Sequence, residues 1–149
     1  MPNYCENTAT FTHKDPTQLQ RIVDLVNADK PLFQEFVPMP EGEEDWYNWN
    51  IENWGTKWDT SVNYITESPD NTSVSLSFDT AWSPPISFYD AMEQLGFGVE
   101  AYYNEPGMGF CGVYKDGDEE CFEYSNFDEI PDFIVEKFGL EDWEEEEAE

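Results

Sequence analysis

Residues 98–124 read GVEAYYNEPGMGFCGVYKDGDEECFEY, and this stretch decides the expected fold. It contains three successive β-like runs, Gly98–Asn104, Gly109–Tyr114 and Glu119–Tyr124. An Asp-Gly pair joins the last two runs and is typical of a two-residue hairpin loop. Because such a loop connects antiparallel strands, the stretch predicts a strand meander.

The expected hairpin also predicts where its two cysteines point. With the Asp-Gly pair as the loop, Cys111 lies opposite Phe122, and Cys121 lies opposite Gly112. Side chains alternate along a strand, so the two thiols then point to opposite faces of the sheet. A shift of one residue would bring both thiols to the same face.

The chain offers few ligands for a metal ion. Its three cysteines, Cys5, Cys111 and Cys121, have no CxxC spacing, and His13 is the single histidine. Structural zinc needs four such ligands, which would take all three cysteines and His13 together, and the expected hairpin points Cys111 and Cys121 to opposite faces. The DGDEE run at 116–120 lacks the ligand spacing and the distal Glu of a calcium-binding EF-hand. We therefore predict no metal and no cofactor, and reduced thiols rather than a disulfide framework.

The other elements follow from apolar spacing and from capping residues. Asp15 can cap a helix that starts at Pro16, and apolar residues from Leu19 to Val26 recur at helical spacing. Together with the meander, the elements predict an α+β fold, a mostly antiparallel sheet with helices packed on one face. The remaining expected elements are strands at 3–13, 32–37, 61–66 and 73–80, and helices at 86–95 and 128–138, each ended by a glycine.

A long Trp-rich insertion separates the expected strand at 32–37 from the hairpin at 61–80. It opens with the acidic run EGEED at 41–45 and then becomes aromatic. Its aromatic residues are Trp46, Tyr47, Trp49, Trp54 and Trp58.

The net charge excludes several classes of partner. The 149 residues include 34 acidic and 6 basic ones, giving a formal net charge of −28. Proteins that bind nucleic acids or anionic membranes directly need Lys and Arg clusters, so neither contact is expected. The chain has no apolar run of about 20 residues, and its start, MPNYCENTATF, lacks the features of a signal peptide. A cytoplasmic location is therefore expected.

Four segments carry a resemblance to a known family: MPNYCEN (1–7), NWGTKWD (53–59), AWSPP (81–85) and YYNEPGMGFCG (102–112). With them, the chain resembles the YubB/Api92-like ferredoxin-fold family of plasmids and phages. The resemblance implies a ferredoxin-like sheet and an origin on a mobile element, and it implies no established activity. We expect one ferredoxin-like domain over residues 1–140, followed by an acidic C-terminal tail at 141–149.

The acidity itself is the leading candidate site. Seven of the last nine residues are acidic, and removing them from −28 still leaves −21 on the rest of the chain. A rigid surface of this kind can occupy the basic cleft of a nucleic-acid enzyme. We predict a non-enzymatic interaction protein that inhibits a basic host protein, a nucleic-acid-handling or defence factor, by DNA mimicry. The residues predicted to bind this partner are Asp116, Asp118, Glu119, Glu120, Glu141, Asp142, Glu144, Glu145, Glu146 and Glu147.

The Trp-rich insertion supports a second hypothesis, a module that binds or sequesters a nucleotide or a sugar. Aromatic rings beside polar groups stack on flat ligands, and Trp54 and Trp58 are four residues apart, so they would share a helical face. Two plainer explanations stay open: the rings cover one edge of the sheet, and the acidity serves only solubility. The candidate ligand-binding residues are Trp46, Trp49, Trp54, Lys57, Trp58 and Asp59.

No catalytic residue is predicted. The GxSxG and P-loop motifs are absent, and His13 has no recognisable Ser or Cys elbow near it. Glycosidases use pairs of carboxylates, but among 34 acidic residues close pairs are unavoidable and carry little information. The sequence therefore favours a binding protein over an enzyme.

Added salt should stabilise this chain. Self-repulsion at a net charge of −28 opposes compaction. Salt screens that repulsion, with a Debye length of about 10 Å at 0.1 M. We expect the melting temperature, followed by circular dichroism, to rise with NaCl concentration. A flat or falling curve would contradict a dense acidic surface.

Overall fold

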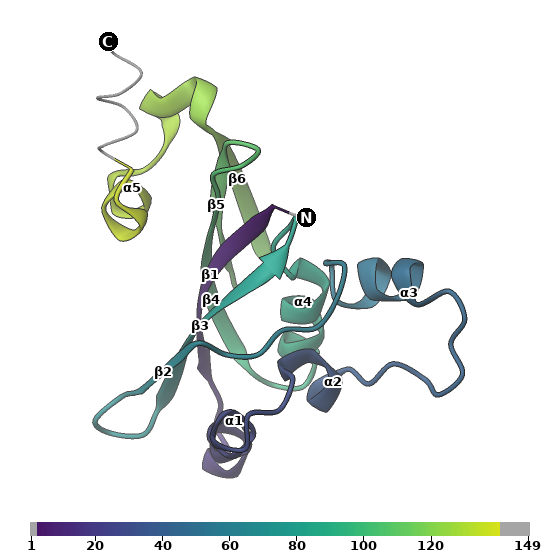
Figure 1. The fold of residues 1–149 in the computed structure, drawn as a ribbon. Helices are drawn as coiled ribbons and strands as arrows, with labels where there is room; N and C mark the ends of the chain where they lie inside the picture. The colour runs from purple at the N-terminus through teal and green to yellow at the C-terminus, as the bar shows by residue number, and fades with distance from the viewer. Residues whose placement is uncertain (1–2, 141–149) are drawn as a thin grey trace.

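The computed structural model describes residues 3–140, which form one six-stranded antiparallel sheet with helices on both sides (Figure 1). The strand order is β2-β3-β1-β4-β5-β6. The predicted hairpin and the predicted three-strand meander are both present. The strands are β1 (Tyr4–Thr12), β2 (Tyr64–Glu67), β3 (Ser73–Ala81), β4 (Gly98–Glu105), β5 (Phe110–Lys115) and β6 (Asp118–Glu123).

The first four strands have the ferredoxin-like arrangement. Together with α1 (Pro16–Asn27) and α4 (Ile86–Gln94), they follow one another as β1-α1-β2-β3-α4-β4. In the sheet, β3 lies between β1 and β2, and β4 lies on the other side of β1. This is the split βαβ topology of ferredoxin-like folds. Strands β5 and β6 extend the sheet beyond β4.

Helix α1 begins where the sequence predicts. The Asp15 carboxylate accepts a hydrogen bond from the Thr17 backbone N–H at 3.0 Å, and Pro16 occupies the first turn. A side-chain oxygen at this position replaces a partner that the first helical N–H groups lack. The apolar stripe then faces the sheet, with Leu19, Ile22, Val23 and Leu25 buried.

The expected strand at 32–37 is wrong: the segment forms helix α2 (Leu32–Phe36). Its buried residues are Leu32, Phe33 and Phe36, a spacing that fits a helix rather than the alternation of a strand. The Asp59 carboxylate also accepts hydrogen bonds from the Phe33 and Gln34 backbone N–H groups at 2.7 and 2.8 Å. A residue 26 positions away therefore supplies the helix start.

The expected helix at 128–138 is divided. Residues Tyr124–Glu129 form the 3-10 helix η1, and α5 spans Asp132–Phe138. Pro131 stands at the start of α5, where its missing N–H costs no hydrogen bond. Gly139 ends α5 in the left-handed region, at a φ of 67°, as predicted.

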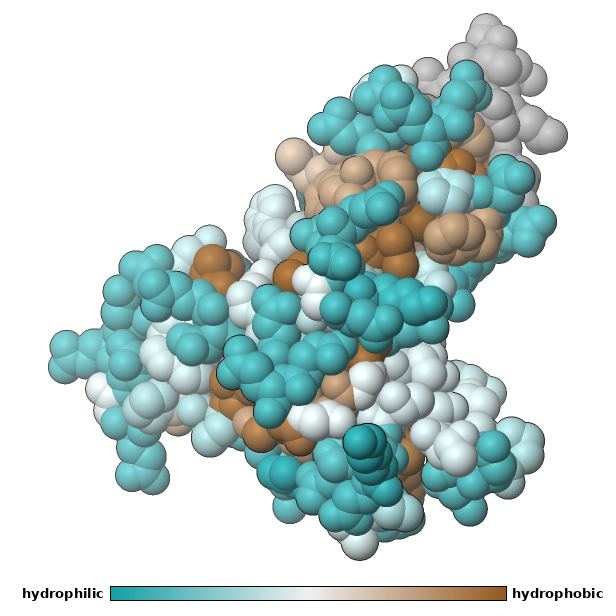
Figure 2. All heavy atoms as spheres, turned by 180° about the vertical axis from the view of Figure 1, so that it is seen from behind, coloured by the Kyte–Doolittle hydropathy of each residue, from teal (hydrophilic) through white to brown (hydrophobic). Residues whose placement is uncertain are grey.

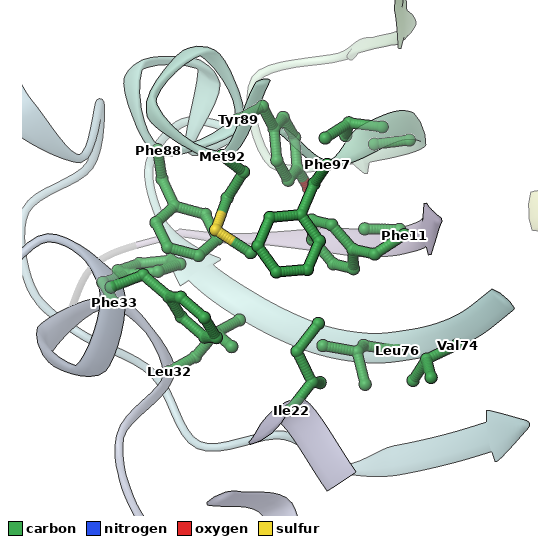
Figure 3. Packing of buried hydrophobic residues seen from close by; sticks show 14 of the residues in the cluster. Phe11, Ile22, Leu32, Phe33, Val74, Leu76, Phe88, Tyr89, Met92 and Phe97 are labelled. Atoms are coloured by element: carbon green, nitrogen blue, oxygen red, sulfur yellow. The ribbon is translucent and has the colours of Figure 1, made fainter. Parts of the chain in front are cut away.

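The main core lies on the sheet face covered by α1, α2 and α4, which we call the core face. Phe11 of β1 and Leu76 of β3 point from the sheet toward these helices. Figure 3 shows Phe33 of α2 beside Phe88 of α4, and their ring centroids are 4.6 Å apart. Burial of such rings favours folding, since large aromatic side chains remove much apolar surface from water.

Helix α5 lies on the opposite face, which we call the open face (Figure 1). Ile134 of α5 and Cys111 of β5 belong to a second, smaller cluster there. The expectation of helices on one face is therefore correct for α1 and α4 and wrong for α5. The second cluster forms because Tyr102, Val113 and Phe122 bring apolar side chains to the open face at the meander.

The predicted hairpin register is confirmed. Cys111 pairs with Phe122, and Gly112 pairs with Cys121. The alternation therefore separates the two thiols: Cys111 is buried, whereas Cys121 is exposed. The predicted acidic tail at 141–149 lies outside the described residues.

One like-charge pair crosses the open face. Glu6 of β1 pairs directly with Asp79 of β3. Partial burial, and then the Asp79 carboxylate, raise the pKa of Glu6 above its ordinary value of 4.5. The folded state therefore favours the neutral form of Glu6. As a result, the repulsion between Glu6 and Asp79 lowers the free energy of unfolding at neutral pH, and less so at a pH near 4.5.

Removing one charge of this pair should stabilise the chain. At pH 7, Asp79→Asn is expected to raise the free energy of unfolding by about 0.5 kcal/mol, measured by urea denaturation. The gain should shrink toward pH 4.5, where Glu6 becomes protonated. Asp70→Asn is the control, because Thr72 and Ser68 donate hydrogen bonds that lower the pKa of Asp70. Equal stabilisation by both variants would show that only net charge matters.

Candidate functional site

Strand β6 presents a row of carboxylates along one edge of the sheet. It is the last strand in the sheet order, and Asp118, Glu119, Glu120 and Glu123 are all exposed on it. We call these four residues the acidic edge. A strand rises about 3.4 Å per residue, so the row spans about 17 Å. Three of the four were predicted as partner-binding residues, and Glu123 extends the row.

A buried tyrosine positions one member of the acidic edge. Tyr103 of β4 is almost fully buried, and its hydroxyl donates a hydrogen bond to the Glu119 carboxylate at 2.5 Å. Burial, and then this hydrogen bond, raise the pKa of Tyr103 far above its ordinary value. The hydroxyl therefore stays a donor, and Glu119 is held against β4 from two strands away.

Gly112 makes this reach possible. It lies on β5 between Tyr103 and Cys121, in the same cross-strand row. A Cβ atom at this position would come within 2.3 Å of the Tyr103 hydroxyl and of the Glu120 carbonyl oxygen. A glycine is required because the tyrosine ring passes over β5 at this point.

The hairpin loop places another carboxylate beside the acidic edge. Asp116 and Gly117 have φ angles of 52° and 91°. Positive φ at both loop positions is the mark of a type I′ turn, whose twist matches that of the flanking strands. The loop thus holds Asp116 at the end of the row, next to the paired residues Lys115 and Asp118.

Two carboxylates of α4 lie near this loop. Asp90 accepts a hydrogen bond from the Tyr114 hydroxyl at 2.7 Å, and Glu93 accepts one from the Val99 backbone N–H at 3.1 Å. Burial raises the pKa of Glu93, and the nearby carboxylates of Asp116 and Asp90 raise it further. The negative field of the acidic edge therefore continues onto the core-face side of the molecule.

The Trp-rich insertion does not gather its candidate residues into one site. Helix α3 (Trp46–Asn53) ends before Trp54, and Trp58 lies in the irregular segment beyond it. The expectation that Trp54 and Trp58 share a helical face is therefore wrong. Trp54 is only 3% exposed and belongs to the main core, where its Nε1–H donates to the Val37 carbonyl oxygen at 2.9 Å.

The other candidate residues of the insertion divide into structural and exposed groups. Asp59 accepts from the N–H groups at the start of α2, and burial raises its pKa while those hydrogen bonds oppose the shift. Trp49 packs against the core. Trp46 and Trp58 are partly exposed, and the Lys57 ammonium lies 4.7 Å from the centroid of the Trp58 ring. The structure therefore brings only Lys57 and Trp58 into contact as a polar and aromatic pair.

Some contributors to the acidic site were missed from sequence. Glu123 continues the strand that carries three predicted residues, so its position on β6 was readable. The roles of Tyr103, Gly112 and Asp90 were not readable, because each depends on a neighbour from another element. The predicted tail residues Glu141, Asp142, Glu144, Glu145, Glu146 and Glu147 lie outside the described residues.

Comparison with known proteins identifies the family. Residues 53–148, more than half of the chain, match the family model described as the ferredoxin-like domain in Api92-like protein. The chain belongs to this family. It is also similar in structure to the protein api92 from Yersinia pseudotuberculosis, with a TM-score of 0.51 and 11% identity over 83% of this chain and 98% of that one. That likeness shows the fold. A search of curated proteins found no match.

Two features are absent from residues 3–140, the part of the chain that the structure describes. No helix in that range combines the length and apolar character needed to cross a bilayer. Within the same range, no group of three or more His, Cys, Asp or Glu side chains is arranged to hold a metal ion.

The two tryptophans of the NWGTKWD segment should respond differently to substitution. Trp54→Ala is expected to lower the free energy of unfolding by about 3 to 5 kcal/mol, because it leaves a cavity in the core. Trp58→Ala should cost about 1 kcal/mol or less, since its ring is 37% exposed and contacts Lys57. Guanidinium denaturation measures both. Similar losses for the two variants would contradict the structural role assigned to Trp54.

Proposed function

We propose that this chain is a non-enzymatic protein of a phage or plasmid that binds a basic, nucleic-acid-handling host protein by mimicking DNA. The observation that carries the proposal is the acidic edge: four exposed carboxylates within the six residues of one edge strand. The plasmid or phage setting and the cytoplasmic location belong to the same proposal.

The spacing of the acidic edge fits a DNA-binding cleft. One DNA strand carries a phosphate about every 3.4 Å along the axis, and a β-strand rises by a similar distance per residue. Because side chains alternate along a strand, Asp118 and Glu120 point to the open face, and the other two members of the acidic edge point to the core face. The four charges over about 17 Å are therefore fewer on each face than the phosphates of one DNA strand, but they are distributed on the same length scale. Lys and Arg side chains are long enough to adjust to that difference.

The acidic edge is also ordered, unlike a charged flexible segment. Glu119 is tied to Tyr103, and β6 is hydrogen-bonded to β5 through its full length. A preordered surface loses less conformational entropy on binding than a flexible segment does. The remaining carboxylates add long-range attraction, which accelerates the encounter with a cationic partner.

The ligand-binding alternative has less geometric support. Trp54 and Asp59 have structural roles in the core and at the start of α2. Lys57 and Trp58 alone form a contact suited to a ligand. We therefore place DNA mimicry first.

Capture from host lysate tests the proposal. The immobilised chain should retain DNA-binding proteins at low salt, identified by mass spectrometry. Duplex DNA, or salt at about 0.5 M, should release them, because the attraction is electrostatic. Failure to retain any nucleic-acid-binding protein, or retention that resists both treatments, would overturn the proposal.

A matched pair of variants tests whether binding depends on the arrangement of the carboxylates on β6 or on net charge alone. The edge variant carries Asp118→Asn, Glu119→Gln, Glu120→Gln and Glu123→Gln. The control variant carries Glu41→Gln, Glu43→Gln, Glu44→Gln and Asp45→Asn, in the segment before α3. Each removes four negative charges from a net charge of −28. We expect the edge variant to bind the captured protein at least about tenfold more weakly and the control to bind nearly as the unmodified chain does. Equal losses of affinity in the two variants would show that binding depends only on net charge.

A further inference from the structure

The open face contains a hollow of about 590 Å³ between the meander and α5. Strands β4, β5 and β6 form its floor, and Phe133 of α5 forms one wall. Its lining residues are Glu100, Tyr102, Val113, Lys115, Asp116, Asp118, Glu120 and Phe133. Seen from behind, much of the molecular surface is hydrophilic, with hydrophobic areas between the polar ones (Figure 2). The hollow thus combines an aromatic wall with carboxylates, and it adjoins the acidic edge.

The aromatic wall already holds a cation. The rings of Tyr102 and Phe133 meet at 77°, with centroids 5.7 Å apart. The Lys137 ammonium lies 4.7 Å from the centroid of the Tyr102 ring. Phe133 is 51% exposed, so much of its ring is uncovered in the free chain. A second cation can therefore approach the wall from the hollow.

The charges that line the hollow favour a positively charged occupant. Four carboxylates line it, from Glu100, Asp116, Asp118 and Glu120, against the ammonium of Lys115 in the lining and that of Lys137 at the Tyr102 ring. The Tyr102 hydroxyl donates to the Glu100 carboxylate at 2.6 Å, which fixes that group as an acceptor. Burial, and then this hydrogen bond, raise the pKa of Tyr102 to about 12. The Tyr102 side chain therefore stays neutral, with the Lys137 ammonium over its ring, and the exposed Phe133 ring is the one that a further cation can contact.

We propose that this hollow receives an arginine side chain of the basic partner protein, with the guanidinium against the Phe133 ring and its N–H groups donating to Glu100 and Glu120. This inference rests on the proposed function, since it names the anchor within that interface. Arginine fits better than lysine because its planar group stacks on rings and donates two parallel hydrogen bonds to one carboxylate. Its alkyl stem packs against Val113.

Charge argues against two occupants of the hollow that this protein could itself provide. A second copy would bring a net charge of −28 toward the same carboxylates. The segment 141–149 carries seven acidic residues and no basic one, so it too is repelled. A cationic partner is the complementary choice, and a buried arginine anchored by aromatic rings is a common centre of binding energy in protein interfaces.

A short peptide tests the hollow directly. N-acetyl-Gly-Arg-Gly-amide is titrated into the full chain and followed by ¹H–¹⁵N NMR, with the citrulline analogue as an uncharged probe of the same shape. We expect saturable shifts centred on the amides of Tyr102, Val113 and Phe133 with the arginine peptide only. The same shifts with citrulline, or no shifts at these residues, would overturn the inference.

Matched variants locate the contact. Phe133→Ala and Glu100→Gln should each weaken arginine-peptide binding at least about fivefold. Tyr64→Ala and Glu67→Gln are the controls, because both residues are exposed on β2 at the other edge of the sheet. Glu100→Gln keeps an oxygen that accepts from Tyr102, so a loss of binding there reports on charge rather than on folding. Equal effects in the β2 controls would reject the hollow as the site.

The outcomes for the hollow and for DNA mimicry are separable. Phe133 and Glu100 lie outside the acidic edge. If the peptide binds the hollow but duplex DNA releases nothing from the lysate capture, DNA mimicry fails and the arginine site stands. If DNA-sensitive capture persists while both hollow variants bind the captured protein unchanged, the arginine anchor fails and DNA mimicry stands.

Discussion

The stability of this fold depends on the balance between the burial of aromatic side chains and the repulsion among acidic residues. A net charge of −28 drives the chain apart, so the buried rings of the core face must supply an opposing free energy. Phe33 makes ring contacts with Phe88, Phe78 and Trp54, drawn from α4, β3 and the segment after α3. This cluster ties the inserted helices to the ferredoxin-like sheet. An acidic surface that must stay ordered depends on it.

The carboxylates themselves divide into two kinds. Some are consumed by the fold: the fully buried Glu105 accepts from the Gly107 and Met108 backbone N–H groups at 2.8 and 2.7 Å, and Asp59 does the same for α2. Others, as on β6, have exposed side chains, although Glu119 also accepts a hydrogen bond from Tyr103. Counting acidic residues in the sequence mixes the two kinds. Only the exposed carboxylates could take part in the proposed interaction, so the proposed binding surface is smaller than the net charge suggests.

Strands β5 and β6 connect the fold to the proposed interaction. They extend the four-stranded ferredoxin-like unit and move its free edge outward, where β6 lies exposed. The type I′ loop fixes their twist, and the contact from Tyr103 across Gly112 to Glu119 fixes their side chains on the core face. On the open face, the same strands and α5 enclose the hollow. One extension thus supplies both the acidic edge and the proposed arginine site.

The sequence by itself determined the elements whose causes are local. The Asp116-Gly117 loop set the hairpin register, Asp15 and Pro16 started α1, and Gly139 ended α5. Tertiary structure alone decided the features that depend on distant neighbours. Helix α2 has five residues, too few for its periodicity to stand out, and its start is completed by Asp59 from beyond α3. Likewise, α5 lies on the open face because Tyr102, Val113 and Phe122 provide an apolar floor there, and spacing within one segment cannot reveal a contact made with another.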